Sequence, residues 1–465
     1  MGTTASHHSS NSKATEWKGP FSDQEYECLV QKFELVASAS SSASDTRAKL
    51  QSLFQVPLSA SLAAETSADR IQQLGAAFYD LCLYTREAEA RESQSAKLQR
   101  IDFVQAVAAC VRSSSQVVMR SLFRLFAAKG GAVATEDELV QLLLAVLIMA
   151  DETQSSGDAA TLQVAKRLAA AALPADAPSS GGAPATAHQL SCDEFVRWAS
   201  AQFPLLYSIF VSWMSAKCFG AIARPSYHPP RLSHKSEILS SAHFVCLSAV
   251  ATPTQNALHR LYTSSQDGLS FNRLSFHLLG YTGPTLVVIR DTDGAVFGMF
   301  CDSEWKESTR AYGGNGCFLF RFEPAISVYR VTGAASSDGV MYLNSKGFAL
   351  PRGLGMGGTT SQFRLFLSED LDESSYTTTK GLAFEGGRLS GRDNFTIDAL
   401  EVWGCGDDAD VARQSAFRQD AAELITRARK VDKAQFVGSD FDKEMFLGKT
   451  FGHGTDQARV ADDER

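Results

Sequence analysis

Between Leu258 and Cys405 the sequence alternates short aromatic and β-branched runs with glycine-containing turns at a tight, even spacing. Turn signals such as Asp293-Gly294 and Asn315-Gly316 separate the runs, which is typical of strands in an all-β sandwich. The strands expected from this pattern are Leu286–Arg290, Val296–Phe300, Cys317–Phe322, Ile326–Val331, Gly339–Leu343, Phe348–Pro351, Gln362–Leu367 and Thr396–Trp403. The pattern therefore predicts a β-sandwich in this part of the chain.

One glycine-rich run, Gly353-Leu-Gly-Met-Gly-Gly358, matches the glycine spacing of dinucleotide-binding loops. Such a site requires a preceding parallel strand and a following helix, whose N-terminus receives the pyrophosphate. The strand-like run Gln362–Leu367 follows instead, so the sequence predicts a glycine-rich β-turn here. No Walker lysine, H-E-x-x-H or G-x-S-x-G motif occurs. The sequence therefore predicts neither a catalytic site nor a cofactor.

Several motifs in the same stretch follow one another in a defined order. They are Leu258-His-Arg-Leu-Tyr-Thr, Asp267-Gly-Leu-Ser-Phe, Val296-Phe-Gly-Met-Phe-Cys, Tyr312-Gly-Gly-Asn-Gly-Cys-Phe-Leu-Phe, Phe363-Arg-Leu-Phe-Leu and Ile397-Asp-Ala-Leu-Glu-Val-Trp-Gly. Taken in this order, the set resembles the TLDc domain family. The resemblance implies a two-sheet β-sandwich flanked by helices. Known members of the family act in resistance to oxidative stress, or bind and regulate the vacuolar proton-pumping ATPase.

The periodicity is different before this stretch. Apolar residues recur at helical intervals in Phe21–Ala37, Ile71–Tyr84, Phe103–Val111, Val117–Ala127 and Glu136–Ala150. The sequence therefore predicts an α+β protein with several domains. Its expected parts are a disordered leader at 1–20, a helical domain at 21–220, a linker at 221–236, a TLDc domain at 237–406, a C-terminal helix at 407–433 and a tail at 434–465.

The helical segment resembles a pair of EF-hands in the order of helix, short loop, hydrophobic residue, acidic residue and new helix. This order is found at Val133-Ala-Thr-Glu-Asp-Glu-Leu and at Leu190-Ser-Cys-Asp-Glu-Phe. A calcium loop needs oxygen ligands at its first, third and fifth positions. Aligning Glu194 with the twelfth position places alanines there, at 183, 185 and 187. The sequence therefore predicts a degenerate EF-hand-like scaffold without a bound metal.

Cysteine usage and charge limit the remaining classes of function. Nine cysteines are spread singly from Cys28 to Cys405 without a C-x-x-C pair, so neither a disulfide framework nor a zinc site is expected. Thiols in or beside strands, such as Cys301 and Cys317, are expected to be buried rather than reactive with peroxide. The formal net charge is −8 and no run rich in lysine and arginine occurs, which disfavours nucleic acid as a partner.

The first residues, Met1-Gly2-Thr-Thr-Ala-Ser6, fit the N-myristoylation pattern, in which Gly2 is exposed after removal of the methionine. The alternative is a polar leader that carries no lipid. A single myristoyl chain gives only marginal membrane affinity, on the order of 10⁴ M⁻¹. Because no second lipid signal or polybasic run lies nearby, stable residence on a membrane is expected to need a protein partner.

The segment Asp407–Lys433 is typical of one amphipathic helix. Apolar residues at four- and three-residue intervals form a narrow seam of Phe417, Ala421, Leu424, Ala428 and Val431. Two interpretations of this seam remain open. The helix either packs on its own sandwich, or docks in the groove of a partner. The partner-binding residues expected in the second case are Phe417, Leu424, Arg427 and Val431.

The second interpretation follows the lysosomal, mTOR-associated branch of TLDc proteins, which the chain resembles in the order of its parts. That resemblance implies a non-enzymatic adaptor on the cytosolic face of a lysosomal or vacuolar membrane, with a cytosolic pool. It would bind subunits of the vacuolar ATPase and modulate the pump or the attached mTOR-type nutrient signalling. Two alternatives are a TLDc protein with protective redox activity of its own, and a myristoylated calcium sensor.

Overall fold

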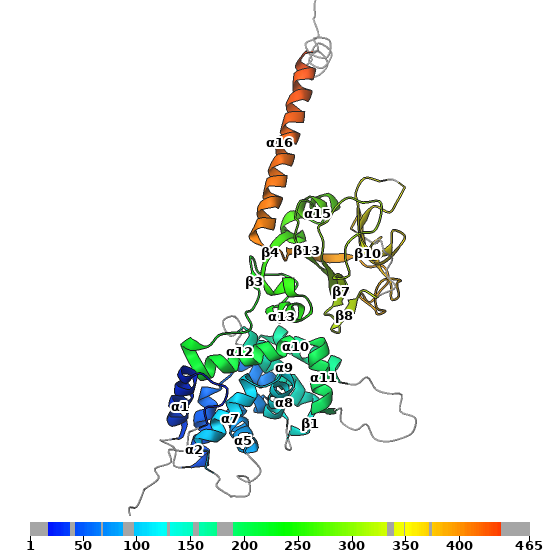
Figure 1. Ribbon diagram of the computed structural model, residues 1–465. Coiled ribbons are helices and arrows are strands. Elements are labelled where there is room, and N and C mark those ends of the chain that lie inside the picture. Colours follow the sequence, from blue (N-terminus) through cyan, green and yellow to red (C-terminus); the bar gives the residue numbers. More distant parts are fainter. Residues whose placement is uncertain are drawn as a thin grey trace, which may run out of the picture.

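The computed structural model describes residues 17–37, 42–66, 68–86, 97–127, 131–151, 158–173, 189–332, 339–347, 349–371 and 374–438, with side chains along the last helix described as far as Arg427. The molecule has a helical part (residues 17–222), a β-sandwich (residues 231–404) and a long C-terminal helix that extends away from both (Figure 1). The predicted order of a helical region, a β-rich region and a C-terminal helix is confirmed.

The helical part is built around one helix that is apolar on every side. Its helices are α1 (Asp23–Ala37), α2 (Ala43–Leu53), α3 (Ala60–Glu65), α4 (Asp69–Gln72), α5 (Leu74–Tyr84), α7 (Arg100–Val111), α8 (Ser115–Phe126), α9 (Glu136–Ala150), α10 (Ala159–Ala172), α11 (Cys192–Gln202), α12 (Leu205–Phe219) and η2 (Gly220–Ile222). Every residue of α9 from Glu138 to Ala150 is buried, as expected for a helix without a polar face. The predicted segment Ile71–Tyr84 is divided at Gln73, whose backbone is not helical.

The stretch Leu205–Ile222 is long and apolar enough to cross a membrane, judged by length and composition alone. Half of it is buried inside the protein, and α12 packs against α9 and α7. This packing is that of a core helix.

Two helix–loop–helix units stand side by side in the helical part. The first runs from α8 through strand β1 (Val133–Thr135) into α9, and the second from α10 through strand β2 (Gln189–Ser191) into α11. The two strands pair antiparallel, with Ala134 opposite Leu190. Helices α9 and α11, which follow the two strands, each begin with a capping box. In this motif a side-chain hydroxyl accepts a hydrogen bond from the backbone amide of a glutamate three residues later, and the glutamate side chain accepts one from the backbone amide of the hydroxyl residue.

Within the described residues, the sandwich consists of a seven-stranded and a four-stranded sheet. The seven-stranded sheet has the order β3 (Arg231–Leu232), β4 (Ala257–Thr263), β13 (Ile397–Gly404), β5 (Thr285–Asp291), β6 (Val296–Cys301), β7 (Phe318–Arg321) and β8 (Ser327–Arg330). The four-stranded sheet has the order β12 (Tyr376–Thr377), β11 (Gln362–Ser368), β10 (Gly353–Thr359) and β9 (Met341–Asn344). Neighbouring strands are antiparallel except β3 and β4. Helices α13 (Ser241–Val250), η3 (Thr252–Gln255), α14 (Ser264–Asp267) and α15 (Phe271–Leu278) flank the sheets.

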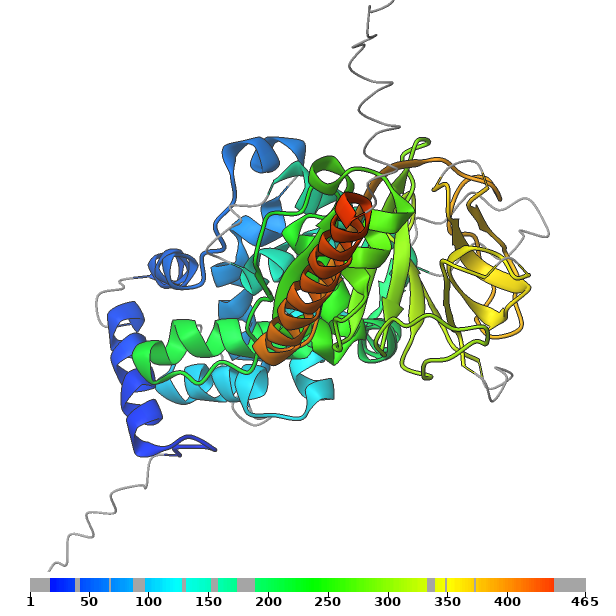
Figure 2. The same cartoon turned by 90° about the horizontal axis from the view of Figure 1, so that it is seen from above.

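Both faces of the seven-stranded sheet are covered (Figure 2). On β5, Leu286 and Val288 belong to the core shared with the helical part, whereas Val287 and Ile289 pack toward the four-stranded sheet. A strand that is buried on both faces has an almost continuous apolar sequence instead of a polar–apolar alternation. The burial of Leu286 through Ile289 shows this directly.

The helical part and the sandwich share one continuous hydrophobic core. Helix α13 bridges them, and its Phe244 ring lies edge-on to Trp403 of β13 with centroids 5.5 Å apart. An ion pair of 2.5 Å between Arg167 of α10 and Glu323 also joins them. The segment expected as a linker at 221–236 contributes β3, so its C-terminal end is part of the sheet.

Two expectations for the sandwich are wrong. The described residues of Phe348–Pro351 contain no strand, and the glycine-rich run predicted as a turn forms β10, a central strand of the smaller sheet. Glycine is needed there because a Cβ atom at Gly355 would lie 2.9 Å from the rings of Phe363 and Phe366. The glycines let these aromatic rings lie across the strand. The remaining predicted strands are confirmed within one or two residues.

Candidate partner-binding helix and its anchor

The C-terminal helix α16 (Asp408–Gly438) follows strand β13 almost directly. The Tyr281 hydroxyl accepts a hydrogen bond from the Gly406 amide at 2.7 Å. A Cβ atom at Gly406 would collide with the Asp410 carboxylate, and one at Gly283 would lie 2.7 Å from it. Glycine at these two positions therefore lets the start of the helix pack closely against the loop that precedes β5. The helix continues to Gly438 instead of ending at Lys433 as expected.

Asp410 fixes the first turn of α16 against this loop. Its carboxylate accepts hydrogen bonds from the Thr282 hydroxyl at 2.5 Å, the Arg413 guanidinium at 2.6 Å and the Asp407 amide at 3.1 Å. Burial by itself would raise the pKa of Asp410, but these bonds outweigh it and lower the pKa below its usual value. The carboxylate is therefore charged at neutral pH, which favours its place at a helix N-terminus.

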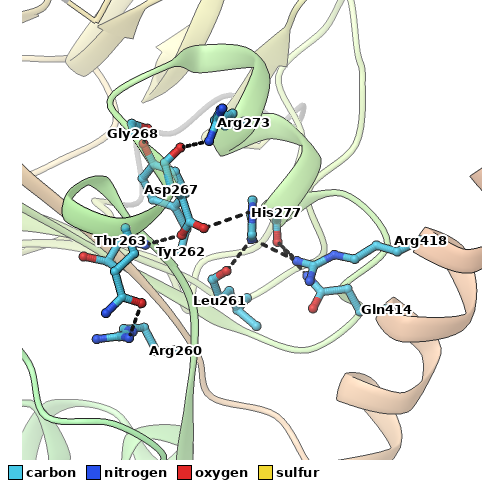
Figure 3. A network of polar contacts seen from close by, with 11 residues as sticks. Arg260, Leu261, Tyr262, Thr263, Asp267, Gly268, Arg273, His277, Gln414 and Arg418 are labelled. Atoms are coloured by element: carbon cyan, nitrogen blue, oxygen red, sulfur yellow. Dashed lines mark hydrogen bonds and ion pairs between the residues drawn. The ribbon is translucent and has the colours of Figure 1, made fainter. Parts of the chain in front are cut away.

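His277 of α15 holds the next turns of α16 (Figure 3). The Gln414 side chain donates to the His277 carbonyl at 2.6 Å, and the Arg418 guanidinium donates to the same oxygen at 3.2 Å. Gln414 is 3% exposed, so its amide is effectively removed from water. The contacts of Asp410, Gln414 and Arg418 are called the anchor below.

The His277 ring connects the anchor to strand β4. Its Nδ1 lies 2.6 Å from the Leu261 carbonyl, which accepts hydrogen bonds only, so in the neutral ring Nδ1 carries the proton. Its Nε2 lies 3.6 Å from the Asp267 carboxylate, and these two groups form an ion pair only when the ring carries both protons. Asp267 in turn accepts from the Thr263 amide, as Figure 3 shows. The anchor is therefore tied to a strand of the main sheet.

Two aromatic residues lie at the surface beside the anchor. The Arg418 guanidinium is 5.4 Å from the centre of the Phe276 ring, and burial lowers the pKa of Arg418. Phe417 packs on Gly280, where any Cβ atom would collide with its ring. Both rings remain 46% exposed. They form an apolar surface at the foot of the projecting helix.

The four partner-binding residues predicted from the sequence have different environments. Phe417 is at the foot of the helix, whereas Leu424, further along, is 63% exposed. Arg427 pairs with Glu423 of the same helix at 3.1 Å. Val431 lies in the helix, but its side chain is outside the described residues, as is the whole of Gly2. The structure thus places Phe417, Leu424 and Arg427 along one helix, and the described side chains of these three residues do not converge on a common site.

The anchor lies on a stripe of the helix that hydrophobic spacing did not reveal. Val411, Gln414 and Arg418 pack on the sandwich, and the same three- and four-residue spacing continues to Ala421 and Ile425. Ile425 is 52% exposed and was missed because it lies beside the predicted seam instead of in it. Gln414 and Arg418 were missed because they are polar, and a search for apolar periodicity passes over them.

The described residues contain no group of three histidine, cysteine, aspartate or glutamate side chains that could hold a metal ion. Glu194, which was aligned with the last calcium-loop position, serves the capping box of α11, and Glu138 serves the capping box of α9. Glu138 accepts from the Thr135 amide and pairs with Arg70 at 2.9 Å, and Glu194 accepts from the Ser191 amide at 2.9 Å. The predicted alanine positions 183, 185 and 187 lie outside the described residues.

The sequence has recognisable relatives. Residues 232–406 match the model of the TLDc domain. The mTOR-associated protein MEAK7 of Gallus gallus is 38% identical over 154 residues, which are 33% of this chain and 32% of that protein. The MEAK7 protein of Danio rerio is 31% identical over 215 residues, 43% of this chain and 46% of that protein. Oxidation resistance protein 1 of Xenopus tropicalis is 28% identical over 181 residues, 38% of this chain and 20% of that protein. The chain thus spans less than half the length of these relatives.

Proposed function

Because residues 232–406 are a TLDc domain, we propose that this chain is a non-enzymatic adaptor that binds the vacuolar proton-pumping ATPase through α16. Its place of action is the cytosolic face of a lysosomal or vacuolar membrane, with a cytosolic pool. There it modulates the pump or mTOR-type nutrient signalling. The similarity to mTOR-associated relatives over the TLDc region supports this function over the others considered.

The observation that carries the proposal is the division of α16 into an anchored foot and a projecting remainder. Beyond Arg418 the helix leaves the sandwich and extends from the body of the protein (Figure 1). Leu424 and Ile425 are more than half exposed on this projecting stretch. An apolar face presented on a rigid helix is suited to a groove on a partner. Because the anchor sets the direction of the helix in advance, less conformational entropy is lost on docking.

The helical part serves in this proposal as a degenerate EF-hand pair without calcium control. The two helix–loop–helix units and their antiparallel β1–β2 ribbon support an EF-hand-like scaffold. The bonds of Glu138 and Glu194 within their capping boxes argue against a calcium sensor, because the bidentate ligand of a calcium loop needs a free carboxylate.

The buried thiols of α13 and the sandwich argue against redox activity of the protein's own. Burial raises the pKa of the Cys246 thiol to about 12, and burial also raises the pKa values of the Cys301, Cys317 and Cys405 thiols well above their usual range. Peroxide reacts with the thiolate, so a buried thiol held in its protonated form is a poor nucleophile. This favours an adaptor over a peroxide-consuming protein.

The docking role is tested by charging the exposed apolar side chains of α16. Leu424→Asp and Ile425→Asp are each expected to weaken association with the pump about thirtyfold, because loss of an apolar contact at the centre of an interface costs about 2 kcal/mol. Thr426→Asp is the matched control, since Thr426 is exposed on the same turn and bonds only within the helix. Co-purification of pump subunits from cell membranes, quantified by mass spectrometry, measures the effect. Equal recovery with all three variants would contradict docking through this face.

Membrane placement is tested separately. If Gly2 carries a myristoyl chain and the pump supplies the second attachment, Gly2→Ala is expected to move most of the protein from the membrane fraction to the cytosol. The physical reason is that neither attachment by itself gives stable binding. Cell fractionation measures the ratio, and the melting temperature should not change. An unaltered ratio would show that Gly2 contributes nothing to membrane attachment.

A further inference from the structure

A cleft of about 500 Å³ lies where the helical part meets the sandwich. The helical part contributes Leu168 of α10, Trp198 of α11 and Phe203, while the sandwich side contributes Cys246 of α13 and Val328 of the edge strand β8. The inner residues are buried, whereas Trp198 and Val328 are half-buried. A volume of this size, with apolar and aromatic walls at a junction of two parts, is typical of a site for a small apolar ligand.

The lining of the cleft constrains the charge of its occupant. Among the described residues that line it there is no lysine, arginine or histidine, and the charged side chain present is Glu385 at the exposed rim. A carboxylate or phosphate headgroup would have no cation to pair with and would be repelled by Glu385. The cleft therefore suits an apolar chain that ends in an uncharged group, such as an amide.

The N-terminus of the protein is within reach of the cleft. Phe203 in the cleft wall precedes α12, whose 15 residues span about 22 Å. At the far end of α12, the Phe219 ring is 5.7 Å from that of Phe21. The chain from Gly2 to Phe21 extends up to about 60 Å. Phe21 is thus roughly 30 Å from the cleft, about half the distance that this chain can cover.

We propose that this cleft binds the acyl chain of N-myristoylated Gly2 and holds it between the helical part and the sandwich when the protein is away from the membrane. The inference rests on the lipidation that forms part of the proposed function, and adds to it an internal site that competes with the bilayer. The amide that joins the acyl chain to Gly2 is uncharged, which matches the lining better than a free fatty acid does.

The competition between the cleft and the bilayer for the acyl chain follows from two binding constants. A tethered chain has an effective concentration of about 1 mM at a site within reach. If the cleft binds the acyl chain about as well as a bilayer, with a constant on the order of 10⁴ M⁻¹, the internal state is favoured about tenfold. Occupation of the cleft should therefore reduce membrane binding about tenfold.

The test uses full-length protein acylated by an N-myristoyltransferase, which joins the acyl group of myristoyl coenzyme A to the Gly2 amine and releases the thiol. Ala171→Trp and Ser327→Phe fill the cleft from opposite walls. Ala170→Trp is the control, because Ala170 is an exposed neighbour on α10 that does not line the cleft.

Sedimentation with phosphatidylcholine vesicles measures binding, and intact mass confirms acylation. Both cleft variants are expected to bind vesicles about tenfold more strongly than the wild type and the control. In a Gly2→Ala background none of these substitutions should alter binding.

A melting measurement makes the result independent of how well the variants fold. Acylation should raise the melting temperature of the wild type above that of Gly2→Ala, because a ligand bound to the folded state stabilises it. Myristic acid added to the Gly2→Ala protein should have little effect, since its carboxylate is unpaired in the cleft. If myristic acid stabilises the protein and acylation does not, the occupant is a free fatty acid and the proposal is wrong.

Failure of this inference is distinguishable from failure of the proposed function. Efficient acylation without any change in melting temperature, or with equal vesicle binding by cleft variants and control, overturns the internal site while leaving pump association through α16 intact. Absence of acylation by the transferase overturns both the internal site and the lipid anchor. Pump recovery by the Leu424→Asp variant is measured in either case and reports on docking independently.

Discussion

Replacing Glu401 with alanine is expected to lower the free energy of unfolding by about 3–5 kcal/mol. Glu401 lies on β13 and is 1% exposed. Its carboxylate accepts hydrogen bonds from the Ser236 hydroxyl at 2.6 Å, the Glu237 amide at 2.7 Å and the Trp403 indole at 3.0 Å. Alanine would leave these donors without a partner in a buried site. Each buried donor that loses its partner costs about 1–3 kcal/mol.

Asp398, on the same strand, offers a control, because it compares the loss of an exposed carboxylate with the loss of the buried carboxylate of Glu401. Asp398 pairs with Arg290 at 2.7 Å, but its side chain is 48% exposed, so Asp398→Ala should cost less than about 1 kcal/mol. Urea unfolding of both variants, followed by tryptophan fluorescence, gives the two free energies. Equal losses would show that the Glu401 bonds stabilise the fold no more than a surface ion pair does.

The contacts of Glu401 also give a physical reason for one of the motifs seen in the sequence. The motif Glu401-Val-Trp403 places a carboxylate and an indole on the same side of β13, where they bond to each other. The carboxylate then holds residues 236 and 237, which follow the short strand β3. The segment expected as a linker is consequently fastened to the sheet at its end. The sequence shows that Glu401 and Trp403 are two residues apart. It does not show that Glu401 accepts a hydrogen bond from the distant backbone amide of Glu237.

The strands that were predicted correctly are those with large apolar side chains and clear turns. Strands β5, β6 and β7 have both features and were found to within a residue or two. Strand β10 was not found, because its glycines have no strand propensity and its place in the sheet depends on the rings of Phe363 and Phe366 on the neighbouring strand. Only the tertiary contact makes glycine favourable there.

The position of α16 could likewise be predicted only in part from the sequence. Its apolar seam was visible, but the residues that fix its position are largely polar, and their partners lie on α15 and in the loop before β5. The hydrogen bond from Gln414 to the backbone carbonyl of His277, more than a hundred residues earlier, leaves no periodic signal in the sequence. Neither of the two interpretations made from the sequence describes the whole helix. Its foot packs on the sandwich, whereas Leu424 and Ile425 beyond the foot are exposed.

Two truncations are expected to separate these roles. Ending the chain after Gly406 removes the anchor, uncovers the surface around Tyr281 and Leu279, and leaves the Thr282 hydroxyl without the Asp410 carboxylate. Loss of one buried apolar contact and several hydrogen bonds should lower the free energy of unfolding by about 3 kcal/mol or more. Ending the chain after Asp420 keeps every anchor contact, so the free energy should change by less than about 0.5 kcal/mol.

Pump association should be lost in both truncated proteins, because each lacks Leu424 and Ile425. The chain that ends after Asp420 lacks Leu424 and Ile425, and two central apolar contacts of about 2 kcal/mol each correspond to a loss of about a thousandfold in affinity. It should therefore be as stable as the full chain and yet fail to recover pump subunits. Chemical unfolding and co-purification on the same two proteins decide the matter. If the protein ending at Asp420 still binds the pump, the projecting part of α16 is not the docking element. If the protein ending at Gly406 is as stable as the full chain, the anchor contributes little to folding, and the direction of α16 in the free protein would have to be fixed by its partner instead.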